Sequence, residues 1–209
     1  MAWSPARVSA KAPVTYTPES PWDDGRNCAG SFTAGARELG HFLRAQFPVI
    51  HDVGGYVCRQ NTANTANTSV HGLGRALDLM IRRLPDGSAD PRGDEVAQWL
   101  IDHADEIGVQ TIIWNRSIWS VGRTGTGSLR AYTGPSSHTD HIHMELNAAG
   151  AAKQTPWFSR PGSSSSAGES SIVPVVLASV VAASMVVAVY YGVKMVRQKR
   201  SRSLELDVA

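Results

Sequence analysis

The chain of 209 residues is long enough for one domain with flanking segments, and two full cores would be crowded in it. With 42% hydrophobic and 18% charged residues it is not a wholly disordered chain, and two cysteines are too few for a disulfide-stapled miniprotein. Residues 1–171 hold 15 Lys and Arg against 16 Asp and Glu. Such a body has no broad positive field, so nucleic acid is not an expected partner.

The first segment, residues 1–27, is rich in Pro, Ser and Asp, and we expect it to be extended, either wrapping the domain or remaining mobile. Residues 28–158 form the expected domain. Its apolar residues recur at helical spacing near 33–46 and again at 94–107, where Gly108 follows the last turn. Short apolar runs predict strands at 55–58, 76–81, 110–114 and 141–146.

These helices and strands mix without regular alternation. We therefore expect an α+β fold with a small, mainly antiparallel sheet and flanking helices.

The end of the chain changes composition. Residues 159–171 are a linker rich in Ser, Gly and Pro, and residues 172–193 carry no charge. A helix over this uncharged segment is roughly 33 Å long, which predicts a transmembrane helix. The tail, 194–209, begins with a basic cluster that the positive-inside rule places in the cytoplasm, with the domain outside. The sequence thus predicts a single-pass membrane protein.

The N-terminus does not match this orientation, because residues 1–16 lack the continuous apolar core of a secretory signal peptide. Three explanations stay open: the C-terminal span drives translocation, the true start codon lies upstream, or the domain faces the cytosol.

The cysteines bear on the same question. A bond between Cys28 and Cys58 closes a loop of about thirty residues, worth about 3–4 kcal/mol, and requires an oxidising compartment. Two unpaired buried thiols are the alternative.

Two segments carry the side chains that can do chemistry. In the first, His71 and Asp78 stand seven positions apart with two glycines between them, so that a tight turn can bring them together. In the second, His141, His143 and Glu145 share one face of a predicted strand. Two histidines and one carboxylate are enough to hold a catalytic zinc and leave a position for water. The alternative is a pair of strand histidines and a glutamate that face solvent.

The combined pattern is more specific than either part. Ser69 opens the series Ser-x-His-x-x-Gly-x-Ala-x-Asp, and Asp140 opens a later Asp-x-x-His. Together they resemble the zinc peptidases that group D-alanyl-D-alanine carboxypeptidases with L-alanyl-D-glutamate endopeptidases. The wider superfamily includes lysostaphin-type peptidases and the hedgehog domain. The resemblance covers roughly residues 54–146.

The resemblance implies roles for six residues. Asp140 matches the general base, although an aspartate before a strand often only caps a turn. His141 is similar to an extra active-site histidine. Arg59 matches an arginine that steadies the substrate and the oxyanion, but two residues are inserted between it and the preceding tyrosine. The implied zinc ligands are His71, Asp78 and His143.

These expectations describe a membrane-anchored, zinc-dependent peptidase that hydrolyses peptide bonds of peptidoglycan, of the D,D-carboxypeptidase or L,D-endopeptidase type. Its partners would be a wall peptide and, through residues 172–193, a membrane. A non-catalytic, zinc-stabilised module that binds cell wall or protein is the main alternative. A cytosolic tail-anchored protein that acts on another peptide is a third.

Overall fold

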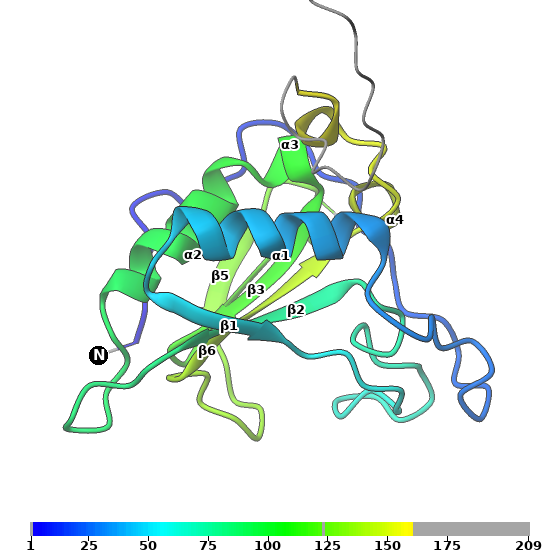
Figure 1. The fold of residues 1–209 in the computed structure, drawn as a ribbon, viewed down its shortest axis with the longest axis horizontal. Coiled ribbons are helices and arrows are strands. Elements are labelled where there is room, and N and C mark those ends of the chain that lie inside the picture. The colour runs from blue at the N-terminus through cyan, green and yellow to red at the C-terminus, as the bar shows by residue number, and fades with distance from the viewer. Residues whose placement is uncertain (1, 123, 161–209) are drawn as a thin grey trace, which may run out of the picture. The chain divides into compact units, whose positions relative to one another are not determined.

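The computed structural model describes residues 2–122 and 124–160, all within the first of two units of the chain, Met1–Ser165. Six strands form one sheet in the order β1-β2-β6-β3-β4-β5, and all neighbouring strands are antiparallel. The predicted α+β domain with an antiparallel sheet is therefore confirmed (Figure 1). The strands are β1 (Ile50–Gly54), β2 (Ala76–Ile81), β3 (Val109–Trp114), β4 (Ser117–Ser120), β5 (Ser128–Ala131) and β6 (His141–Leu146).

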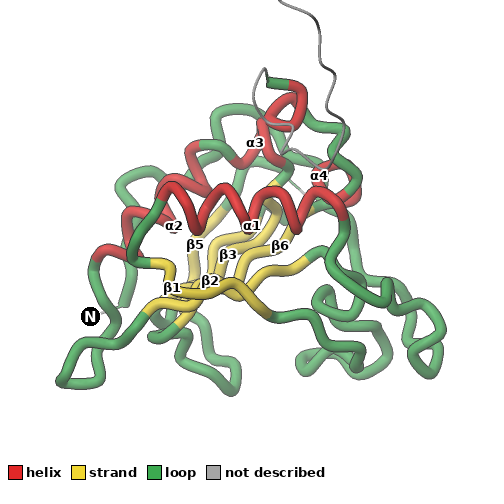
Figure 2. The backbone as a smooth tube through the Cα atoms, viewed as in Figure 1, coloured by secondary structure: helices red, strands yellow, loops and turns green. Residues whose placement is uncertain are grey.

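The helices gather on one side of the strands, and long loops lie on the other (Figure 2). Helix α1 contacts β1 and β2, and α2 contacts β3. The Thr33 side chain accepts the Ala36 N–H and caps the start of α1. Leu39 and Leu43 of α1 are fully buried toward the sheet. The helices are α1 (Ala34–Gln46), α2 (Arg92–Asp102), α3 (Ala104–Ile107), α4 (Ala148–Ala151) and a 3₁₀ turn (Pro156–Ser159).

The two faces of the central strands differ because side chains alternate along a strand. Leu77 and Leu79 of β2 are fully buried in the core under the helices. Asp78 lies between them and therefore points to the helix-free face. Strand β6 repeats the pattern and pairs Asp78 directly with His143. The antiparallel register thus places an aspartate and a histidine, 65 positions apart in the chain, side by side.

The structure corrects two predicted elements and adds two strands. The strand expected at 55–58 lies earlier, in β1, because the chain leaves the sheet at Gly55, which has a φ of +113°. The helix expected at 94–107 is divided at His103 into α2 and α3, and Gly108 ends it in the left-handed conformation. Strands β4 and β5 were not predicted.

The N-terminal segment packs along the domain. Trp3 and Val14 are buried in the core cluster. The Trp3 N–H donates to Asn115 O, and the Val14 N–H donates to Gly125 O. Residues 2–27 contain neither helix nor strand, yet they supply buried contacts to the sheet.

The transmembrane helix, and with it the single-pass localisation, requires correction. Among residues 2–122 and 124–160, every helix is too short or too polar to cross a membrane. The segment for which the span was predicted, 172–193, lies outside the described residues.

Candidate metal centre

Three side chains from two strands and one turn converge on the helix-free face. Asp78 Oδ1 lies 3.6 Å from His71 Nε2 and 3.3 Å from His143 Nδ1. One ligand atom from each residue lies within 4.8 Å of the other two. These are the residues that the sequence predicted as zinc ligands, and the described fold brings all three together as a possible metal-binding group.

Two of the three distances between ligand atoms match those around a zinc ion. Zinc with four ligands at about 2.0–2.2 Å puts its ligand atoms roughly 3.3–3.6 Å apart, which matches both distances to Asp78. Nδ1 of His71 is buried and has no hydrogen-bond partner. A Cβ on Gly55 would lie 2.9 Å from both Asp78 Oδ2 and His71 Nδ1. Only glycine at position 55 leaves enough space for the side chains of Asp78 and His71.

A turn that ends at Gly74 positions His71 in the site. The Gly74 N–H donates to His71 O, and Gly74 has a φ of +65°. A Cβ there would come within 2.3 Å of Ser31 O, so both the backbone conformation and the close approach require glycine. The His71 N–H donates to Ser69 Oγ at 3.3 Å, so the first residue of the motif also contacts the turn.

The two histidines differ in charge. Burial and the nearby His143 lower the pKa of His71 to about 4, so His71 is neutral at pH 7. Burial also opposes a charge on His143, but hydrogen bonds to Asp78 and Glu145 raise its pKa to about 9. Both carboxylates are ionised: opposing the effect of burial, the same hydrogen bonds lower the pKa of Asp78 and bring that of Glu145 to about 2. The raised pKa of His143 thus favours a protonated imidazole between these two carboxylates.

The triad opens into a pocket of about 730 Å³, a size typical of ligand sites. Its wall includes Arg59 and His141, two of the residues implied by the resemblance. Arg59 is close enough to His71 to disfavour a positive charge there. The two inserted residues before Arg59 therefore do not remove it from the site. His138 also lines the pocket, with its ring 4.6 Å from that of His141.

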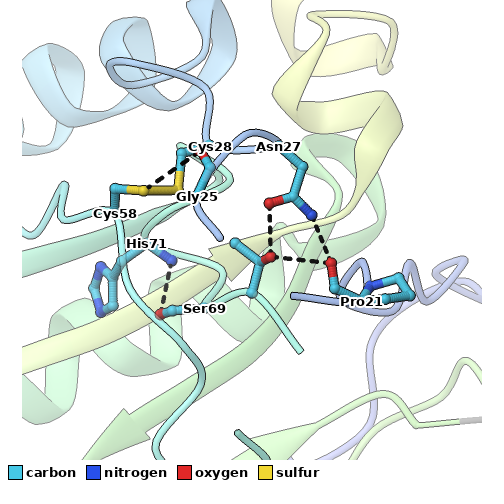
Figure 3. Close-up of a disulfide and its surroundings, with 8 residues drawn as sticks. Pro21, Gly25, Asn27, Cys28, Cys58, Ser69 and His71 are labelled. Carbon is cyan, nitrogen blue, oxygen red and sulfur yellow. Dashed lines mark hydrogen bonds between the residues drawn. A yellow bond between two sulfur atoms is a disulfide. The ribbon is translucent and has the colours of Figure 1, made fainter. Parts of the chain in front are cut away.

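The Cys28–Cys58 disulfide is present and lies beside the segment that carries Ser69 and His71 (Figure 3). Cys58 directly precedes Arg59, whose carbonyl accepts the Ser69 N–H. On the other side, Cys28 Sγ is 3.3 Å from where a Cβ of Gly72 would be. The disulfide thus holds the loop that carries Arg59 beside the turn that positions His71.

Asp140 is the predicted residue that the structure does not bring into the pocket. It is not among the pocket-lining residues, and its carboxylate is 41% exposed. One oxygen accepts from Arg83 at 2.9 Å, and the other lies 2.8 Å from His141 Nδ1. Burial raises the pKa of Asp140, but the His141 bond and Arg83 outweigh it, so the carboxylate is ionised. It reaches the pocket only through His141.

A family model described as the VldE C-terminal domain matches residues 28–143, more than half of the chain. The chain belongs to this family. The matched stretch contains both cysteines, Arg59 and the whole triad. No curated protein and no solved structure gives a significant match.

Two buried polar residues complete the metal corner. Glu145 Oε1 lies 3.2 Å from His143 Nε2, so it holds the nitrogen that does not face Asp78. Gln110 donates to Glu145 Oε2 at 3.2 Å. Gln110 was not singled out from the sequence, although a polar residue inside the apolar run of β3 is the signal that marks it.

Proposed function

We propose that this VldE-family domain is a zinc-dependent peptidase that cleaves peptide bonds in cell-wall peptides. The observation that carries the proposal is the convergence of His71, Asp78 and His143 beside a pocket. The same pocket holds an arginine and further histidines that the metal does not need. The wall-peptide substrate rests on the resemblance of the motif to peptidoglycan peptidases.

Zinc held by the triad would polarise a substrate carbonyl and lower the pKa of water toward 7. The proton acceptor is His141. Asp140 occupies its Nδ1 at 2.8 Å, which leaves Nε2 as the nitrogen that takes the proton and returns it to the leaving amine. Asp140 then acts as a positioning residue and stabilises the imidazolium, while Arg83 keeps the carboxylate in place.

Arg59 stabilises negative charge on the substrate. Its guanidinium donates only to the neighbouring Gln60 carbonyl, at 3.0 Å, and forms none of the ion pairs found among the described residues. A cation without a carboxylate partner at a pocket wall is available for an oxyanion, an interaction worth several kcal/mol in a water-poor site. The Cys28–Cys58 disulfide, next to Arg59 in the chain, holds this arginine close to the triad.

Digestion of purified cell wall by the full chain tests the proposal. We expect hydrolysis by the zinc-loaded protein, loss of hydrolysis with a chelator and recovery on addition of zinc. His141→Ala should retain zinc and lower kcat about 10²- to 10⁴-fold. Equal digestion by wild type and His141→Ala would contradict the assigned proton acceptor.

A zinc-stabilised binding module is the second candidate, and the position of Asp140 outside the pocket favours it. The same experiment separates the two. A protein that binds zinc and sediments with cell wall, but releases no peptide, is a binding module and not a peptidase.

A further inference from the structure

A path of hydrogen bonds leads from His143 through Glu145 to the N-terminal segment. His143 Nε2 contacts Glu145 Oε1, and Gln110 Nε2 donates to Glu145 Oε2. The amide of Gln110 continues to the backbone of Thr17, donating to its carbonyl at 3.2 Å and accepting its N–H at 3.0 Å. The side chains of Glu145 and Gln110 thus connect the candidate ligand His143 to the backbone of Thr17 in the N-terminal segment.

The N-terminal end of this hydrogen-bond path is held in place by further contacts. We call residues 15–18 the N-terminal strap. Arg75 donates to the carbonyls of Thr17 and Pro18, and at 2.8 Å to Leu146 O, at the end of the strand that carries His143. Thr17 Oγ1 accepts the Ala148 N–H at 2.9 Å. The strap lies outside the family match at 28–143, yet it is bound to the sheet beside the metal corner.

Gln110 links the strap to Glu145 in this path, and the Thr111 side chain also hydrogen-bonds Glu145. The Gln110 side chain is fully buried, and both of its polar atoms are occupied by the contacts above. The Thr17 N–H fixes which end of the amide faces Glu145, because only the oxygen can accept it. Buried networks of this kind restrict their members to one arrangement when every group is satisfied.

We propose that Gln110, held by the N-terminal strap, is a positioning residue of the metal centre. It fixes Glu145, which in turn orients the His143 ring so that Nδ1 faces Asp78 and His71. The inference rests on the proposed metal centre but not on the reaction. Outer partners of metal ligands commonly change metal affinity by 10- to 100-fold, and Gln110 is one bond further out, so we expect about tenfold.

The test measures the zinc dissociation constant of the full chain against a competing chelator, with zinc as the only ligand. Gln110→Met removes the amide and keeps the length of the side chain. Gln98→Met is the matched control, because Gln98 also clamps the N-terminal segment: it accepts the Arg7 N–H and donates to Arg7 O. Gln98 lies on α2, outside the pocket lining.

We expect Gln110→Met to weaken zinc binding about tenfold and to change the absorption spectrum of bound Co²⁺, while Gln98→Met leaves both unchanged. The melting temperature of each metal-free variant shows that it is folded. Gln110→Leu, with a shorter side chain, provides a second variant, and it should weaken zinc binding to a similar extent. Wild-type affinity in the folded Gln110 variants, or an equal loss in Gln98→Met, would overturn the inference.

The outcomes separate this inference from the proposed function. A wild-type protein without zinc affinity removes the metal centre itself. A protein that binds zinc tightly, depends on Gln110 for it and cleaves no wall peptide keeps the positioning role and loses the peptidase.

Discussion

The two faces of the sheet are built from the same strands but serve different purposes. On the helix side, Leu77, Leu79 and Met144 are fully buried and contribute to stability. On the open side, Asp78 and His143 alternate with them, and both carry charge in a corner that a metal ion would fill. A one-residue step along β2 or β6 therefore separates a side chain of the core from a side chain of the candidate metal centre. Substitutions on the two faces should therefore have separable effects.

The largest expected contrast is between Leu79→Ala and His71→Ala. Removing the buried Leu79 side chain should lower the free energy of unfolding by about 2–5 kcal/mol and leave zinc affinity nearly unchanged. Removing His71 should weaken zinc binding by more than about a hundredfold, with a smaller effect on the metal-free protein, because its Nδ1 has no hydrogen-bond partner. Chemical denaturation and zinc titration measure the two quantities. If both variants lost zinc equally, the faces would not be independent.

A second contrast lies within one pair of neighbours on the open side. His141→Ala should lower kcat about 10²- to 10⁴-fold, whereas Asp140→Asn should lower it only about tenfold, because Asp140 acts through His141. Zinc content should stay at the wild-type value in both. Steady-state hydrolysis of a defined wall peptide measures the ratio. A larger loss in Asp140→Asn than in His141→Ala would make Asp140 the direct proton acceptor.

Two adjacent glycines test the space that the cluster needs. Gly55→Ala places a methyl group 2.9 Å from Asp78 Oδ2 and His71 Nδ1, at a φ of +113°, and should weaken zinc binding about 10- to 100-fold. Gly54→Ala is the control, since nothing lies within 4 Å of its new Cβ, and it should bind zinc as the wild type does. Competition with a chelator measures both. Equal affinities for the two variants would show that the cluster does not depend on this gap.

The two ligand histidines also predict a pH dependence of zinc affinity. Because the pKa of His143 is raised to about 9, its imidazole is protonated at neutral pH and must lose a proton to bind metal. His71, with a pKa near 4, is already neutral. Affinity should therefore fall about tenfold per pH unit as pH decreases from 8.5 to 6. A hundredfold fall per unit would mean that both histidines lose a proton.

The sequence predicted the central elements best. The bounds of β2 and β6 match the short apolar runs of the sequence. The three converging residues, His71 in the turn before β2, Asp78 on β2 and His143 on β6, are those that the resemblance implied. Strand β1 lies at 50–54 and not at the expected 55–58, because His51 and Asp52 interrupt its apolar pattern at the edge of the sheet. Strand β5 is short and mostly exposed, so it lacks the apolar signal of a buried strand.

Side-chain direction and long-range partners were the parts that sequence reasoning could not supply. Asp140 precedes β6, where strand alternation does not yet fix its orientation, and the ion pair with Arg83 depends on tertiary structure. Gln110 likewise acquires its role only when β3 pairs with β6 and the N-terminal segment packs beside it. Spacing within a motif predicts which residues meet, but not which partners orient them.

Metal analysis of the purified full chain tests the central claim most directly. Elemental mass spectrometry should find one zinc ion per chain in the wild type and in Leu79→Ala, and none in His71→Ala or His143→Ala. A wild-type chain that takes up no zinc, or a His143→Ala variant that keeps a full equivalent, would contradict the account.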